Sequence, residues 1–405
     1  MTLNLRSFFL TITFLGFGAT FAVGQDKTTP ALPGPPAPTE SKEQDDSDRD
    51  SQKRGGDTYR ELSEKTGGLF FDGDFKAAPD DLLGIMLDSS GPDVSRIVSN
   101  RGIAQSGVAT NVDVQVDAST RYVDFVLNHS TRDVFQFSVL RPDGKGLLPL
   151  DADVKLGGTK GLQRVRVTRP VAGVWKVLME GSGRFQFIAN ANSSISFSEI
   201  HFERLVLGLM HPTVQDVEGE LLLNEEVYFD AWLHGHVGDP QLELVTPDGA
   251  VLEELTIRPD SFEKRGGTFT PTSLYKEFHV RASGVDASGS KFTRVAPTVF
   301  SVRSLVVRED PTRWAQPGEP FRFQIQNAGP PQRLSLRAES TSQIPLKLSR
   351  EIVDVGTGST EFLDVELLTA RSEIPRREML FLTAISSSNS EDKASGIMQI
   401  GSSER

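Results

Sequence analysis

The stretch that decides the fold is residues 112–140, which read VDVQVDASTRYVDFVLNHSTRDVFQFSVL. After about residue 104 the pattern changes to a period of two, and strand-like runs recur at 112–116, 122–127 and 134–140 with turn-forming residues between them. A period of two sends successive side chains to opposite faces of a strand, so each run predicts a half-buried β-strand. The stretch therefore predicts an all-β domain.

The same pattern recurs along the rest of the chain in three blocks. We place a first β-sandwich at 105–200, a second at 201–308 and a third at 309–402. In the second block, VYFDAWLHGHV at 227–237 predicts one strand. The Pro-Asp-Gly turn after one strand of the first block returns in the second block at Pro247-Asp248-Gly249. The predicted fold class is mainly β, with tandem sandwiches.

The front of the chain has the pattern of an export signal. Residues 1–24 contain a basic residue, Arg6, then the apolar run FFLTITFLGFGATFAV, and end in small residues, which predicts cleavage between Gly24 and Gln25. An uncleaved anchor is the alternative, but the run is shorter than the roughly 20 residues of a spanning helix. We expect a secreted protein with no stable membrane insertion after cleavage.

Two segments separate this leader from the β-rich part. Residues 25–56 are proline-rich and then densely charged, with almost no large apolar side chains, which predicts a disordered spacer. Residues 57–104 predict a short α/β stretch, with one helix near 59–65, a strand at 69–71 and a second helix at 78–87. This stretch is too short to fold alone.

Composition narrows the possible functions. The chain has 405 residues and a formal net charge of -12, which disfavours binding to nucleic acid or to anionic membranes. It contains no cysteine, so disulfides, thiolate metal sites and cysteine nucleophiles are excluded. We expect no cofactor.

Several segments resemble one family of extracellular proteins. TYRELSEKTGGLFFDGDF is similar to the last helix and strand of a von Willebrand factor A domain in hemicentin-type proteins. PVAGVWKVLMEGSGRFQF resembles the end of the galactose-binding-like jelly roll that follows it, and FHVRASGVDASGSKFTRVAPTVFS and PGEPFRFQIQNAG resemble parts of immunoglobulin-like modules. The resemblance implies a remnant of an A domain at 57–104, a jelly roll at 105–200 and two immunoglobulin-like sandwiches.

The sequence departs from that family at its metal site. An A domain binds metal through a D-x-S-x-S loop near its start, and the nearest string here, Asp88-Ser89-Ser90-Gly91, has the wrong spacing. No metal-binding residue is therefore carried over. Either most of the A domain was lost in evolution or the sequence is truncated at its front.

Two kinds of side chain are weak candidates for a binding site. His234 and His236 would lie on one face of the strand predicted at 227–237 and form half of a zinc site, although exposed strand histidines are the usual case. Trp175, Trp232 and Trp314 are candidate platforms for stacking against sugars. Trp175 and Trp232 alternate with apolar neighbours inside predicted strands, however, and this pattern favours core packing for both of them.

Asn128 and Asn192 begin N-x-S glycosylation sequons near the ends of predicted strands. The sequence has no G-x-S-x-G elbow and no glycine-rich phosphate loop. The leading hypothesis is a secreted, noncatalytic protein of adhesion or matrix type that binds extracellular proteins through its sandwiches. The alternatives are a carbohydrate-binding protein that uses the 105–200 domain and, further off, an unrecognised hydrolase.

Overall fold

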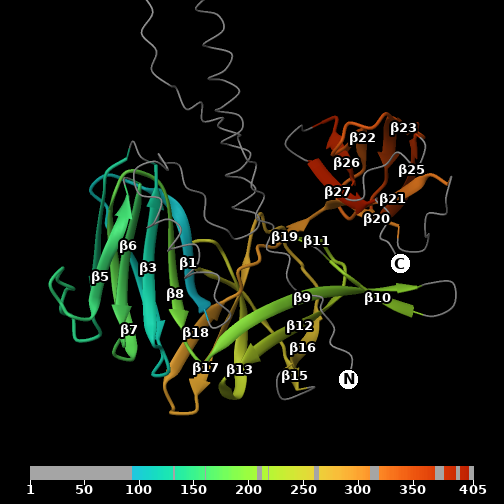
Figure 1. Ribbon diagram of the computed structural model, residues 1–405. Helices are drawn as coiled ribbons and strands as arrows, with labels where there is room; N and C mark the ends of the chain where they lie inside the picture. The colour runs from blue at the N-terminus through green and yellow to red at the C-terminus, as the bar shows by residue number, and fades with distance from the viewer. Residues whose placement is uncertain are drawn as a thin grey trace, which may run out of the picture. The chain divides into compact units, whose positions relative to one another are not determined.

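The computed structural model describes residues 94–130, 133–159, 161–207, 212–217, 219–259, 264–310, 319–369, 378–388 and 393–400. Every regular element within these residues is a β-strand (Figure 1), which confirms the mainly β fold class. No helix among them is long and apolar enough to cross a membrane. The predicted leader with Gly24 and Gln25, the spacer and the two helices lie outside the described residues.

The first sandwich has the interleaved strand order of a jelly roll. Its sheets run in the orders β1-β8-β3-β6-β5 and β2-β7-β4, with antiparallel neighbours throughout (Figure 1). Its core gathers around Phe125, Trp175 and Phe187. The strands are β1 (Val94–Ala104), β2 (Thr110–Val116), β3 (Tyr122–His129), β4 (Phe135–Leu140), β5 (Val154–Thr159), β6 (Leu162–Thr168), β7 (Gly173–Gly181) and β8 (Gly183–Asn192).

The second sandwich has the strand order of an immunoglobulin fold. One sheet runs β10-β9-β12-β16-β15, the other runs β14-β13-β17-β18, and β11 pairs with β19 in parallel. Four phenylalanines of its core surround Phe202, and one of them, Phe300, contacts it edge to face at 4.9 Å between ring centroids. The strands are β9 (Ser196–Leu207), β10 (Pro212–Asp216), β11 (Glu220–Leu222), β12 (Val227–His234), β13 (His236–Val245), β14 (Val251–Leu255), β15 (Arg258–Pro259), β16 (Lys264–Phe269), β17 (His279–Asp286), β18 (Lys291–Val295) and β19 (Ser301–Arg303).

The third sandwich repeats this plan with two four-stranded sheets, β20-β21-β25-β23 and β24-β22-β26-β27. Phe323, Ile325 and Leu382 lie fully buried between them. The strands are β20 (Leu305–Glu309), β21 (Phe321–Asn327), β22 (Gln332–Ser340), β23 (Leu346–Leu348), β24 (Ile352–Val355), β25 (Ser359–Leu367), β26 (Met379–Ser386) and β27 (Lys393–Gln399).

Sheet membership places the module boundaries differently from the sequence analysis. β1 begins at Val94 and pairs with β8 over its whole length, so residues 94–104 belong to the first sandwich and not to a separate remnant. β9 begins at Ser196 and belongs to the second sandwich, and β20 begins at Leu305 and belongs to the third.

The strand predicted at 227–237 is two strands. β12 ends at His234 and β13 begins at His236, in different sheets, and Gly235 turns the chain between them with a φ of 78°. A Cβ on Gly235 would lie 2.3 Å from the carbonyl oxygen of Ser194, so only glycine fits there.

The two Pro-Asp-Gly turns share one geometry. In the first, the amide of Arg141 donates to Lys145 O at 2.8 Å, and in the second the amide of Thr246 donates to Ala250 O at 2.9 Å. The glycines that close them, Gly144 and Gly249, have φ angles of 84° and 88°. The turn predicted from the repeated tripeptide is therefore present in both sandwiches.

Candidate functional site at the junction of the first two sandwiches

The first and second sandwiches are joined by a very short connection. β8 ends at Asn192 and β9 begins at Ser196, and Ser193 and Ile195 in between are buried. A buried connection leaves little freedom for the two sandwiches to move separately. The connection lies within a network of buried hydrogen bonds that involves both sandwiches.

At its centre lies Arg294 of β18, whose side chain is 0% exposed. Its Nη2 donates to Asp117 Oδ2 at 2.5 Å and to Ser193 Oγ at 2.7 Å. Its Nε donates to the carbonyl oxygen of Ile195 at 3.0 Å, and its Nη1 donates to Thr293 O at 2.8 Å. The guanidinium from the second sandwich thus binds the first sandwich and the connection together.

Asp117, which follows β2 in the first sandwich, is equally buried. Its Oδ1 accepts the amide of Ser119 at 3.0 Å and the Ser119 hydroxyl at 2.6 Å, while its Oδ2 accepts the Thr120 hydroxyl at 3.1 Å. Burial alone raises the pKa of the Asp117 carboxyl, but the Arg294 charge and the hydrogen bonds outweigh it, so the pKa lies below its ordinary value. The ion pair is therefore charged and fully hydrogen-bonded.

The second Pro-Asp-Gly turn takes part in the same junction. The backbone amide of Arg101 in β1 donates to Pro247 O at 2.9 Å, and Asn100 Nδ2 donates to Asp248 O at 2.9 Å. Arg101 also forms an ion pair with Glu277 of the second sandwich. A turn that closes a hairpin in one sandwich thus binds the edge strand of its neighbour.

A buried histidine lies near these arginines. His279 is almost fully buried at the start of β17, and its Nδ1 lies 3.2 Å from Thr298 O. Burial and the charges of Arg96 and Arg101 lower the pKa of His279 to about 4, because each disfavours the imidazolium. The imidazole is neutral at neutral pH.

The second and third sandwiches are joined by Ser304 alone, which separates β19 from β20. Arg308 of the third sandwich donates to Glu225 Oε2 at 2.8 Å and to Glu220 O at 3.1 Å. Arg204 of β9 donates to Gln326 Oε1 at 3.4 Å, and burial lowers its pKa to about 10. Polar contacts therefore hold both connections.

His234 and His236, the weak zinc candidates, do not lie on one face of a single strand as predicted, because β12 ends at His234 and β13 begins at His236 in a different sheet. Of the other histidines considered, His201 pairs with Glu199 and His279 is buried at the junction, while His211 lies outside the described residues. In the described part of the chain, no three His, Cys, Asp or Glu side chains converge on a possible metal position.

The tryptophans divide between two roles. Trp175 is fully buried, packs against Phe125 at 5.8 Å between ring centroids, and donates to Val171 O at 2.9 Å. It is a core residue, and the sugar platform considered for it does not exist. Trp232 lies in β12 on the face opposite its core residues and is half-buried, so core packing was the wrong expectation there. Trp314 lies outside the described residues.

The two sequons differ in their surroundings. Asn128 lies in β3, is half-buried and pairs with Gln186 and Leu162 across the sheet. Asn192 ends β8 beside the junction, and the residue after it, Ser193, is bound by Arg294. A glycan at Asn192 would therefore leave the chain beside the Arg294 cluster.

Ser193 completes the polar cluster at the junction. Its Oγ donates to Asp117 Oδ1 at 3.1 Å, accepts from Arg294 Nη2 at 2.7 Å and lies 2.9 Å from Ser119 Oγ. These hydrogen bonds connect the first sandwich, the connection and the second sandwich.

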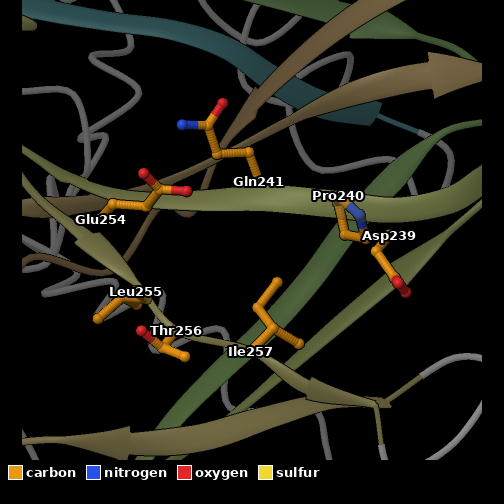
Figure 2. A pocket seen from close by; sticks show the side chains of 7 residues that line it. All are labelled: Asp239, Pro240, Gln241, Glu254, Leu255, Thr256 and Ile257. Carbon is orange, nitrogen blue, oxygen red and sulfur yellow. The ribbon is translucent and has the colours of Figure 1, made fainter.

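Two open hollows lie on the second sandwich. One, of about 360 Å³, is lined by Asp239, Gln241 and Glu254 with Leu255 and Ile257 below, and Figure 2 shows the two carboxylates on opposite sides of it. It sits where β13 departs from regular pairing between Val237 and Gln241. The other, of about 470 Å³, lies on the outer face of the sheet that contains β12.

No family model matches the chain, and no curated protein matches it. Among solved structures it is similar to a propeptide form of the Bacillus licheniformis lipase BlEst2, with 12% identity and a TM-score of 0.24 over 51% of this chain and 43% of the lipase. It is also similar to the ectodomain of mouse nectin-like molecule 4, with 10% identity and a TM-score of 0.17 over 73% and 94%. Titin domains I67–I69 match with 10% identity and a TM-score of 0.18 over 75% and 96%. The chain thus spans less than half of the lipase.

Proposed function

We propose that this chain is an exported, noncatalytic binding protein of hemicentin-like type, in which β-sandwiches are held in fixed succession to meet extracellular protein partners. The observation that carries the proposal is the buried Arg294–Asp117 pair, which joins two sandwiches through side chains that are 0% exposed. A fixed succession keeps the faces and edges of neighbouring sandwiches in register, so that one partner can contact both.

The short connections support the same idea. Three residues separate β8 from β9 and one residue separates β19 from β20. Flexible linkers of Gly and Ser would let each sandwich bind independently, whereas these connections are buried or hydrogen-bonded. Binding to a preordered surface costs less conformational entropy.

Sheet edges offer the means of contact. β10 is the edge strand of its sheet, and Val214 on it is exposed. An edge strand presents unpaired backbone groups to which a partner strand can add.

The experiment has two arms. The full chain with its own leader is expressed in a secreting cell line, and a second version carries Leu10→Arg in the apolar run; the first is expected in the medium and the second inside the cells. The secreted protein is then crosslinked and chromatographed alone and with a panel of purified extracellular matrix proteins.

We expect a partner or self-association that is weakened in Arg294→Met and unchanged in Arg337→Met, whose salt bridge to Glu339 is exposed. Retention of the wild-type chain in the cells would overturn the export. Equal binding by the two variants, or no captured complex, would overturn the proposed mode of action.

A further inference from the structure

We propose that the outer face of the β12 sheet in the second sandwich binds a chain of neutral pyranose sugars, with Tyr228 as the stacking platform. The hollow of about 470 Å³ on this face has a volume in the range of small-molecule sites. This inference does not depend on export or on a protein partner.

The pairing of β12 with its neighbours places the side chains that line the hollow next to Tyr228. On β12, Tyr228 lies opposite Glu203 of β9 on one side and Thr268 of β16 on the other. Two residues along the same face, Asp230 lies opposite Gly266. Tyr228 is 40% exposed and lines the hollow together with Glu203 and Asp230.

Gly266 of β16 gives the Asp230 carboxylate its place in the lining of the hollow. Gly266 is buried, and a Cβ on it would lie 2.8 Å from Asp230 Oδ1. A larger residue at this position would therefore displace the Asp230 carboxylate.

The residues match a sugar in their chemistry. An aromatic ring covers the apolar face of a pyranose, and carboxylates accept hydrogen bonds from neighbouring hydroxyls. Glu203 and Asp230 outnumber the one cation of the lining, Arg258, so an acidic sugar would be repelled on balance. The ligand class is thus a neutral one.

The sheet pairing argues against a peptide strand in the same place. β12 is paired with β9 and β16, and β16 is paired with β12 and β15, so neither strand offers a free edge beneath the hollow. A ligand over β12 and β16 is therefore recognised by side chains. Leu205 of β9 and Val214 of β10, which are exposed beside Tyr228, lengthen the apolar wall.

Trp232 suits a ligand longer than one sugar. It lies on the same face of β12, four residues from Tyr228, which corresponds to about 13 Å along an extended strand. A chain of two or three sugars spans this separation.

The purified full chain is titrated calorimetrically with hexasaccharides of β-1,4-linked glucose, mannose and xylose, and with heparin as the acidic probe. We expect at least one neutral hexasaccharide to bind at millimolar concentration or below and heparin not to compete for the site. Tyr228→Ala is expected to weaken binding about tenfold or more, and Tyr228→Phe to keep it within about twofold, because the ring remains.

Phe362→Ala is the matched control, since Phe362 is an aromatic residue of the third sandwich that is 47% exposed. It is expected to bind as the wild type does. Gly266→Ala displaces the Asp230 carboxylate from another strand and is expected to weaken binding, so that the proposal does not depend on one variant. Urea unfolding of each variant shows whether it folds.

Three results would overturn the inference: no neutral hexasaccharide binds the wild type, heparin binds in their place, or binding survives in folded Tyr228→Ala. A protein partner that is lost while sugar binding persists would concern the proposed function alone.

Discussion

Replacing Arg294 with methionine removes a buried cation from the junction and leaves a buried anion behind. Asp117 would keep the bonds from Ser119 and Thr120 but lose its counter-charge at a position that is 0% exposed. Removing one partner of a buried pair costs about 3 to 5 kcal/mol. Four hydrogen bonds from the guanidinium are lost, while the Asp117 carboxylate keeps its other hydrogen bonds. We therefore expect Arg294→Met to lower the free energy of unfolding by about 3 kcal/mol, at the lower end of that range.

The double variant Asp117→Asn/Arg294→Met separates this cost from the loss of packing. Asparagine keeps acceptor capacity toward Ser119 without the charge, so the double variant should recover part of the stability lost in Arg294→Met. The coupling energy of the two sites should be on the order of 2 kcal/mol. An exposed pair, Arg337 and Glu339, supplies the control, with a change of less than about 0.5 kcal/mol in Arg337→Met.

Urea unfolding of the full chain, followed by tryptophan fluorescence, measures these values. Trp175 reports on the first sandwich and Trp232 on the second. We expect the two sandwiches to unfold in one transition in the wild type and at separate midpoints in Arg294→Met. A loss below about 1 kcal/mol in Arg294→Met, or single-variant losses that simply add in the double variant, would refute the view that the pair couples the sandwiches.

Three further predictions concern other sites. The pKa of His279 is lowered from 6.5 to about 4 in the folded chain, so the unfolded chain takes up the proton first as the pH falls. The free energy of unfolding should therefore fall by about 3 kcal/mol between pH 6.5 and pH 4. His279→Gln should lose that part of the pH dependence when urea midpoints are compared along an acid titration. Gly235→Ala should lower the free energy of unfolding by about 2 kcal/mol or more, because the residue has a positive φ and the new Cβ would lie 2.3 Å from the Ser194 carbonyl oxygen. Gly238 also has a positive φ, 72°, but has open space around it, so Gly238→Ala should cost only about 1 kcal/mol. Equal losses of the two variants in calorimetry would contradict the role of the close approach. Trp175→Ala should lower the free energy of unfolding by about 3 to 5 kcal/mol, because it leaves a cavity in the core, and should leave sugar binding unchanged. If a folded Trp175→Ala variant bound the sugar more weakly in the titration, the sugar site would lie in the first sandwich instead.

The strands of the core could be predicted where the alternation of side chains is regular. Residues 112–116 alternate without interruption, and the structure has β2 there. Residues 122–127 are mostly apolar, and β3 there is buried on both faces. β1 was missed because its pairing shifts by one residue between Arg96 and Val98. The shift breaks the period of two on which the prediction rests.

The division of the run 227–237 has another cause. Alternation continues through Gly235, so the pattern predicts one strand, while the backbone turns there into the opposite sheet. No change of period therefore marks the end of β12. A glycine between two long polar side chains was the only local sign.

The junction itself had no local sign. Arg294 and Asp117 are 177 residues apart and lie in different sandwiches, and each belongs to an ordinary strand or turn in its own neighbourhood. The contact depends on how two sandwiches meet, which periodicity does not describe. Only the turn at 117–120 could be predicted locally, because Asp117, Ser119 and Thr120 are turn-forming residues between two predicted strands.

The buried Arg294–Asp117 pair also limits how the sandwiches of this chain can be exchanged with those of other proteins. A domain exchange that ended the first sandwich at Asn192 would place Arg294 in a new protein without Asp117. Such a hybrid would have a buried cation and no anion to match it. The first two sandwiches are therefore a single unit of recombination, in gene shuffling and in protein engineering alike, and the cutting points for isolated fragments should flank the pair.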